Sequence, residues 1–242
     1  MHIYAIGDIH GHVDLLRKAH DLIASDMARH GAGQVVHVGD LVDRGPASAE
    51  VVDYLHQGIR AGQDWVVLRS NHDRLFTMFM GDPAAADPCL RADLSWLHPK
   101  IGGAETLRSY GVRSAADRPV AAVHADARAA VPAAHLAFLA SRPAWHRAGG
   151  VIFVHAGVRP GIAIEQQSED DLVWIRAGFL DHAGPFEALI VHGHTAIDVP
   201  THYGNRVNID TSAAYGGPLT AVVVDAGEVF HLTPQGRVRL RP

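Results

Sequence analysis

The chain has 242 residues, 48% of them hydrophobic and 19% charged, a composition typical of a globular protein with a substantial core. The formal net charge of −5 provides no basic surface for nucleic acid, and no apolar run approaches the ~18 residues that a membrane span requires. The single cysteine, Cys89, excludes an intramolecular disulfide framework, and the N-terminus lacks the pattern of a signal peptide, so we expect a cytoplasmic protein.

Strands and helices alternate over the first 75 residues. Short β-prone runs lie at residues 2–7, 34–38 and 65–68. Between them, apolar residues recur at helical spacing over 15–27 and 51–59, with Gly31 and Gly62 as stops and Pro46 as a possible start. This strand–helix–strand–helix–strand order predicts a parallel sheet covered by helices.

The pattern changes over residues 76–148, which are rich in alanine and interrupted by six prolines. No convincing strand is visible there, so we interpret this stretch as a mostly helical insertion into a single domain that spans residues 1–242. Strands resume at 151–154, 188–191 and 206–209, and residues 219–224 and 228–232 form a predicted hairpin.

Polar residues with metal-binding side chains follow five of the predicted strands. The carboxyl ends of parallel strands meet at one edge of a sheet, so side chains at these ends are expected to converge. They are Asp8, His10, Asp40, Asn71, His155 and His194. Carboxylate, amide and imidazole donors without thiolate favour manganese, iron or zinc. Two such ions roughly 3.5–4 Å apart can hold a phosphoryl group and activate water.

The sequence around these residues resembles the phosphoprotein-phosphatase branch of the calcineurin-like metallophosphoesterases. The matching motifs are Gly7-Asp8-Ile9-His10-Gly11, Gly39-Asp40-Leu41-Val42-Asp43-Arg44-Gly45, Asn71-His72, His155-Ala156-Gly157 and Gly193-His194-Thr195. They occur in the family's order, from near the N-terminus to about residue 195. The resemblance implies an α/β fold with two central β-sheets flanked by helices.

The resemblance also implies a role for each matching residue. One metal ion would be held by Asp8, His10 and Asp40, and the other by Asp40, Asn71, His155 and His194. Manganese is the first expectation for both ions, with iron or zinc as alternatives. His72 would protonate the leaving group with Asp43 orienting its ring, while Arg44 and Arg176 would bind phosphoryl oxygens.

Two features depart from the family pattern. Ser70 and Asp73 stand where the family usually has glycine and glutamate, and a positive φ at residue 70 would strain the turn by about 1 kcal/mol. The segment containing Trp96, Gly102, Gly103 and Thr106 looks like one shared by bacterial members, and we expect it to pack beside the cleft.

Three functions are compatible with these motifs. Our main prediction is a phosphomonoesterase, specifically a bacterial protein phosphatase that acts on a phosphorylated protein or a small phosphate ester through a metal-bridging hydroxide. The alternative is a symmetrical diadenosine tetraphosphate hydrolase, which Asp73, Leu75 and Phe76 favour and Asp43 disfavours. The third is a non-catalytic scaffold, which the complete set of ligands argues against. The sequence gives no indication of an oligomeric state.

Overall fold

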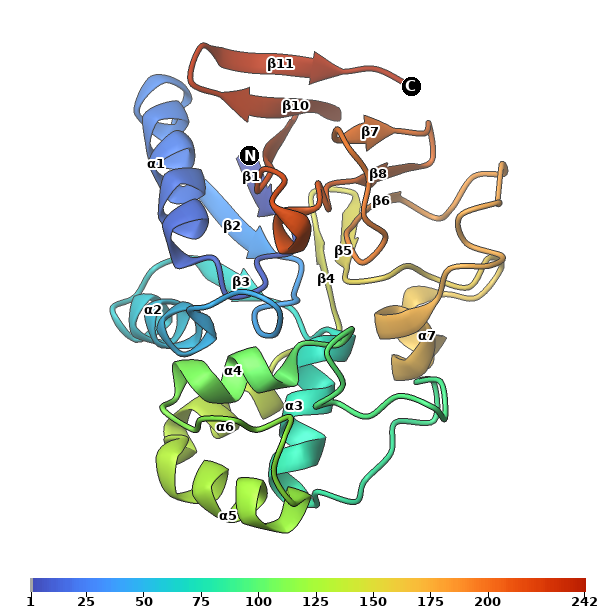
Figure 1. Cartoon of the computed structure of the whole chain (residues 1–242). Helices are drawn as coiled ribbons and strands as arrows, with labels where there is room; N and C mark the ends of the chain where they lie inside the picture. Colours follow the sequence, from blue (N-terminus) through green and yellow to red (C-terminus); the bar gives the residue numbers. More distant parts are fainter. Residues whose placement is uncertain (1) are drawn as a thin grey trace.

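The computed structural model describes residues 2–242, which form two packed β-sheets with helices on both outer sides (Figure 1). The first sheet has six strands in the order β11-β10-β9-β1-β2-β3. These are β1 (His2–Ile6), β2 (Gly33–His37), β3 (Trp65–Val67), β9 (Ala221–Asp225), β10 (Glu228–Thr233) and β11 (Gly236–Leu240). Strands β1 to β3 are parallel, as predicted, while β9, β10 and β11 are antiparallel to their neighbours, so the sheet is mixed.

The second sheet has five strands in the order β4-β5-β6-β8-β7. These are β4 (Trp145–Ala148), β5 (Val151–Val154), β6 (Leu189–His192), β7 (Thr201–His202) and β8 (Arg206–Asn208). The sequence did not predict β4, β7 or β11, and the expected absence of strands over residues 76–148 is wrong for β4. All three are edge strands that carry polar side chains, so they lack the continuous apolar run of a central strand.

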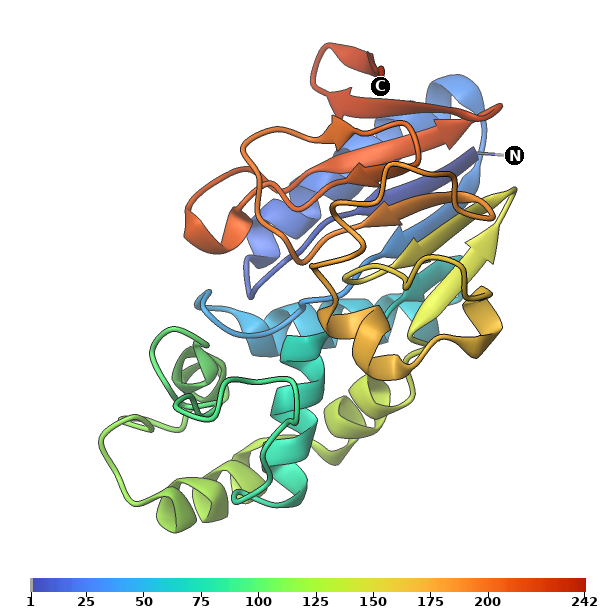
Figure 2. The same cartoon turned by 90° about the vertical axis from the view of Figure 1, so that its right-hand side faces the viewer.

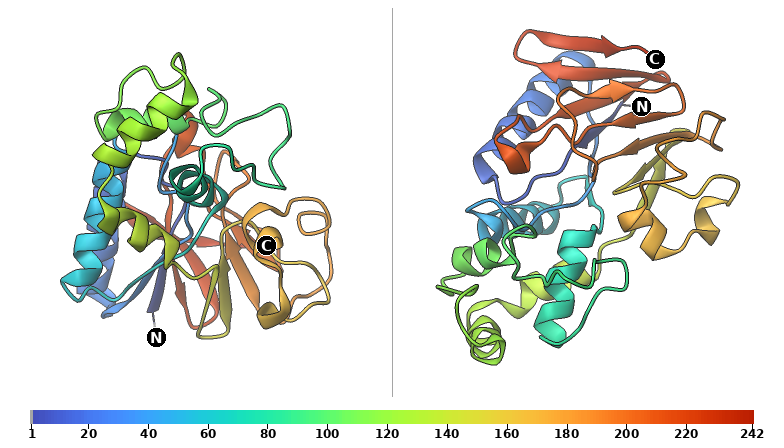
Figure 3. Two further views of the ribbon diagram at one scale, coloured as in Figure 1. Left: turned by 90° about the horizontal axis from the view of Figure 1, so that it is seen from below. Right: turned by 45° about the vertical axis from the view of Figure 1, so that its right-hand side comes forward.

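Alternation of side chains along the strands produces four layers. In β1, Tyr4 and Ile6 face one core, which includes α1 (Val13–His30) and α2 (Ser48–Arg60). The intervening Ile3 and Ala5 pack against the second sheet. The outer face of that sheet is covered by residues 156–186, which include a 3-10 turn (Ile164–Gln166) and α7 (Glu169–Trp174). Figure 2 and Figure 3 show the two sheets between these outer layers.

The helical region lies at one end of the sheets and shares a core with α2. It comprises α3 (Asn71–Gly81), α4 (Gly103–Ser109), α5 (Val120–Ala130) and α6 (Ala133–Ala140). Phe76, Leu107 and Phe138, from three of these helices, belong to the same buried cluster as Leu55 of α2. The helical region therefore begins at residue 71, five residues before the predicted boundary. Within residues 2–242, no helix combines the length and apolarity that crossing a bilayer demands.

Candidate metal and phosphate site

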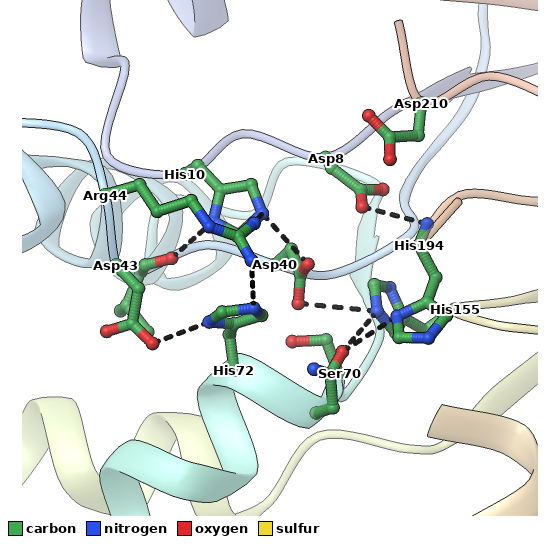
Figure 4. A network of polar contacts seen from close by, with 12 residues as sticks. Asp8, His10, Asp40, Asp43, Arg44, Ser70, His72, His155, His194 and Asp210 are labelled. Atoms are coloured by element: carbon green, nitrogen blue, oxygen red, sulfur yellow. Dashed lines mark hydrogen bonds and ion pairs between the residues drawn. The ribbon is translucent and has the colours of Figure 1, made fainter. Parts of the chain in front are cut away.

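Strand ends from both sheets bring the six predicted metal ligands to one place. Figure 4 shows Asp8, His10, Asp40, His155 and His194 around this centre. Asp8 and His10 follow β1, Asp40 follows β2, and Asn71 begins α3 shortly after β3. His155 and His194 follow β5 and β6 of the other sheet. None of the six is more than 8% exposed. The predicted convergence at the carboxyl ends of the strands is therefore what the structure shows.

Asp40 lies at the centre of this arrangement. Its Oδ2 is 3.0 Å from Nε2 of His10, and its Oδ1 is 3.3 Å from Nε2 of His155. Two groups of possible ligands share this carboxylate, one formed with His10 and His72 and the other with His155 and His194. Oδ1 of Asn71 lies beside the second group, 2.8 Å from His155 Nε2. This geometry suits a carboxylate that bridges two cations.

The hydrogen bonds of the imidazoles leave lone pairs pointing at the centre. Nδ1 of His10 is 2.8 Å from the carbonyl of Val42, and Nδ1 of His155 is 2.9 Å from that of Val38. A carbonyl only accepts, so each Nδ1 donates and each Nε2 directs a lone pair at Asp40. Among the described residues, the buried Oδ1 atoms of Asp8 and Asp40 and Nε2 of His194 have no hydrogen-bond partner. Two divalent cations would satisfy these atoms, so the residues fit a dinuclear site.

Asp8, which follows β1, is hydrogen-bonded to the backbone of a residue from the other sheet. The backbone N–H of His194 donates to its Oδ2 at 2.9 Å. A Cβ at residue 193 would lie 1.9 Å from Asp8 Oδ1, which explains the glycine in the Gly193-His194 motif. In the close group around His10 and Asp40, His72 takes the place that the resemblance assigns to Asp8. The role of Asp8 as a ligand stays a prediction.

Asp210 is a buried member of the site that the sequence analysis left out. It follows β8 and lines the same cavity as Asp8 and Asp40. Burial, together with the charges of Asp210 and Asp40, raises the pKa of Asp8 well above its usual range. The strand-end rule that identified the other residues also applies to Asp210, because it directly follows the 206–209 run.

The predicted acid and the two predicted arginines line the same cavity, whose volume is about 620 Å³. Nδ1 of His72 is 2.7 Å from Oδ2 of Asp43, so the opposite ring nitrogen faces the centre. Nη1 and Nη2 of Arg44 lie 2.7 Å from His10 Nε2 and 3.0 Å from His72 Nε2. Arg176, just beyond α7, donates to the carbonyl of His194 at 3.2 Å. The arginines thus concentrate positive charge where a phosphoryl group would bind.

Backbone strain is concentrated in the same residues. Eight described non-glycine residues have positive φ, and five of them belong to the predicted site. These are His10, Asp40, Asp43, Arg44 and His194. Such conformations cost about 1–3 kcal/mol each and persist only where surrounding contacts enforce them. Their clustering indicates that these side chains are held in place at the expense of local stability.

The strain that a positive φ would impose at Ser70 does not arise. Its φ is −121°, an ordinary extended value, and it caps the N-terminus of α3. Its Oγ accepts from the N–H of Asp73 at 3.2 Å and donates to the Asp73 carboxylate at 2.7 Å. The other oxygen of Asp73 accepts from the N–H of Leu41 at 3.1 Å. Ser70 and Asp73, the two departures from the family pattern, therefore form a capping pair that links α3 to the loop after Asp40.

Apolar and aromatic side chains also line this cavity, together with the charged Arg91, Asp170 and Asp171. The apolar and aromatic residues are Leu90, Leu94, Ile101, Trp174, Ile175 and Tyr215. Tyr215 ends a 3-10 turn (Ala213–Tyr215), is 68% exposed, and its ring centre lies 5.3 Å from the guanidinium carbon of Arg44. Cys89 is exposed and also lines the cavity. His192, by contrast, is buried against Phe179 in the core.

Comparison with known proteins agrees with this geometry. The family model for calcineurin-like phosphoesterase matches residues 1–224. The chain is 27% identical to the asymmetrical bis(5'-nucleosyl)-tetraphosphatase PrpE of Anoxybacillus flavithermus, covering 90% of this chain and 88% of that protein. It is also 27% identical to the symmetrical bis(5'-nucleosyl)-tetraphosphatase of Methylococcus capsulatus, over 86% of this chain and 58% of that one.

A similar fold occurs in a cold-active protein-tyrosine phosphatase of a psychrophilic Shewanella species. The TM-score is 0.62 at 17% identity, and the match covers 99% of this chain and 80% of that one. At this identity the likeness concerns the fold alone. The family model covers nearly the whole chain and the strand-end donors converge as its motifs require, so the chain belongs to the calcineurin-like phosphoesterase family.

Proposed function

We propose that this protein is a metal-dependent hydrolase of dinucleoside polyphosphates, which cleaves a phosphoanhydride bond in the bridge between two nucleosides. Curated relatives of nearly the same length carry this activity in their names. These relatives support the alternative, a diadenosine tetraphosphate hydrolase, better than they support the predicted phosphomonoesterase of the protein-phosphatase branch. We further propose a cytoplasmic location and manganese as the first of the possible metals.

The observation that carries the proposal is the size and the mixed lining of the cavity. Its volume of about 620 Å³ is in the range of pockets that hold whole small-molecule ligands, far more than one phosphoryl group needs. Its lining includes five of the six proposed metal ligands with Arg44 and Arg176, which suits a polyphosphate. The same cavity is lined by the aromatic side chains of Trp174 and Tyr215, which suit a nucleoside.

The residues of the chain have separate tasks in this reaction. Two bound divalent cations would supply positive charge to the phosphoryl oxygens and activate water as the nucleophile. Arg44 and Arg176 orient the transferred phosphoryl group and stabilise the charge that develops on it. His72, oriented by Asp43, faces the same space and can protonate the departing oxygen.

A phosphomonoesterase remains the second candidate because of one contact. The buried Asp43–His72 pair, 2.7 Å apart, is suited to protonating an alkoxide leaving group. A nucleotide leaves as a weakly basic phosphate and has less need of such an acid. Asp43 is therefore the residue that favours ester substrates.

The test compares three substrates with one preparation. Metal-stripped protein is reconstituted with manganese and assayed with diadenosine tetraphosphate, p-nitrophenyl phosphate and a phosphoserine peptide. We expect kcat/KM to be highest for the dinucleotide, and the products, ATP with AMP or two ADP, identify the bond that is cleaved. A higher kcat/KM for the peptide would replace the proposal by the second candidate.

A further inference from the structure

The side chains of Asp43 and Arg44 reach the site from residues whose backbone conformation is energetically unfavourable. Their φ angles are 73° and 68°, in the left-handed region that non-glycine residues avoid. Asp43 contacts His72, and Arg44 contacts both His10 and His72. Relaxation of the backbone at Asp43 and Arg44 toward ordinary φ angles would withdraw both side chains from the centre. Some other part of the chain must therefore stabilise the strained conformation.

The hydroxyl of Thr106 in α4 makes two hydrogen bonds to Asp43. Its Oγ1 accepts from the backbone N–H of Asp43 at 2.8 Å and donates to the carboxylate Oδ1 at 2.7 Å. Both residues are fully buried, so bulk water does not reach this hydroxyl. The two bonds fix the main chain and the side chain of Asp43 together.

Trp96 holds the same carboxylate from a second direction. Its Nε1 lies 3.0 Å from Oδ2 and 3.1 Å from Oδ1 of Asp43. Its ring is itself held by Phe76, with ring centres 5.2 Å apart and nearly parallel planes. Burial raises the pKa of the Asp43 carboxyl to about 7, and the hydrogen bonds from Thr106 and Trp96 counteract this rise. With these hydrogen bonds formed, the Asp43 carboxylate is oriented so that its Oδ2 faces His72.

Gly102 and Gly103 allow this segment to approach so closely. The carbonyl of Gly102 accepts from the N–H of Arg44 at 3.3 Å. A Cβ at Gly102, whose φ is 93°, would lie 2.4 Å from the backbone nitrogen of Arg44. A Cβ at Gly103 would lie 2.5 Å from the Trp96 ring. Glycine is therefore required at both positions for this segment to contact Asp43 and Arg44.

We propose that residues 96–106 of the helical insertion form a positioning clamp, which holds Asp43 and Arg44 in their strained conformation and thereby orients the general acid His72. Trp96 and Thr106 act through Asp43 and touch no reacting atom. The clamp adds a specific role to the expected packing of this segment beside the cleft. The inference applies to dinucleotides and to phosphate esters alike, but it rests on the proposed role of His72 as general acid.

The test exchanges the Thr106 hydroxyl for a methyl group of the same shape. We expect Thr106→Val to lower kcat by about 10-fold or more for phenyl phosphate, a fraction of the 10²–10⁴ that general-acid catalysis supplies. The loss should be smaller for p-nitrophenyl phosphate, whose leaving group needs less protonation, and KM should change little. Thr106→Ser keeps the hydroxyl and should restore most of the activity. Trp96→Phe should give the same leaving-group dependence as Thr106→Val.

Two controls separate positioning from general loosening of the fold. Ser109→Ala removes another hydroxyl of α4, one that contacts Ala49 and the Thr106 carbonyl but not Asp43, and should leave the leaving-group dependence unchanged. In an Asp43→Ala background, Thr106→Val should cause no further loss of kcat, since residues that act through one another are non-additive. Should Thr106→Val not fold, Trp96→Phe carries the same comparison.

Different failures have different meanings. If His72→Asn lowers kcat equally for phenyl and p-nitrophenyl phosphate, the general-acid role itself is wrong. If His72→Asn shows the expected dependence while Thr106→Val and Trp96→Phe do not, the clamp is refuted and the proposed acid stands. Full additivity in the Asp43→Ala background would also refute the clamp.

Discussion

Replacing Ser70 by alanine tests whether this departure from the family pattern stabilises the fold. Ser70 is fully buried, and its hydroxyl both caps α3 and donates to the buried carboxylate of Asp73. Burial raises the pKa of the Asp73 carboxyl to about 8, so this group is largely uncharged near pH 7. Loss of the cap costs about 1 kcal/mol, and a buried carboxyl oxygen left without its donor costs about 1–3 kcal/mol. Because the two losses share one hydroxyl and Asp73 keeps the N–H of Leu41, we expect Ser70→Ala to lower the free energy of unfolding by about 2–3 kcal/mol.

The chain contains a matched control for this substitution. Ser168 caps α7, and its Oγ accepts from the N–H of Asp171 at 3.1 Å and donates to the carboxylate at 2.9 Å. This second Ser-x-x-Asp pair has the same connectivity, but Ser168 is exposed. Water can replace its hydroxyl, so Ser168→Ala should cost only about 0.5–1 kcal/mol.

Urea unfolding of the two variants and the wild type, followed by circular dichroism, measures the difference directly. The comparison requires that the variants share one m-value, so that the shift in midpoint reports stability. Equal losses for Ser70→Ala and Ser168→Ala would refute the argument from burial. Ser70→Gly adds a second check, because a strained turn would be stabilised by glycine, whereas the observed φ of −121° predicts destabilisation.

Three further predictions concern stability, metal binding and specificity. Asp26 is buried where Arg237 of β11 and Tyr4 of β1 bond to it, so Asp26→Asn should cost roughly 2–3 kcal/mol near pH 7. Burial alone would raise the pKa of Asp26, but the hydrogen bonds from Arg237 and Tyr4 lower it on balance. The stability that Asp26 contributes is therefore complete above about pH 4 and is lost as the pH falls through the folded-state pKa. A pH-independent difference in unfolding free energy between Asp26→Asn and wild type would contradict this. Asp40→Asn should reduce the bound metal, measured by plasma emission spectrometry, at both positions, and an unchanged metal content would exclude a bridging carboxylate. Tyr215→Ala should raise KM for diadenosine tetraphosphate by about 10-fold with little effect on p-nitrophenyl phosphate, and a parallel rise for both would exclude a nucleoside contact.

Local patterns in the sequence predicted the elements that bury a continuous apolar face. Strands β1, β2, β3, β5, β6, β8, β9 and β10 and helices α1 and α2 were predicted to within two residues at nearly every end, because apolar periodicity reflects burial on one face. The edge strands β4, β7 and β11 were missed because they carry polar residues and bury little. The strand-end rule and the family motifs predicted that the six proposed ligands would meet His72 and Arg44. The structure brings these side chains to one place, since parallel strands align their carboxyl ends.

Only the tertiary structure decided which residues hold that site in place. The φ angle of Ser70, the position of Asp210 beside Asp8, and the contact of Trp96 and Thr106 with Asp43 are not visible in any local pattern. Thr106 is 63 residues from Asp43 in sequence, and their hydrogen bonds form only because α4 packs against α2 and the loop after β2. Sequence alone therefore determined which chemical groups meet at the strand ends. The orientation of those groups depends on contacts between distant segments, because packing and not local preference selects strained backbone angles and buried hydrogen bonds.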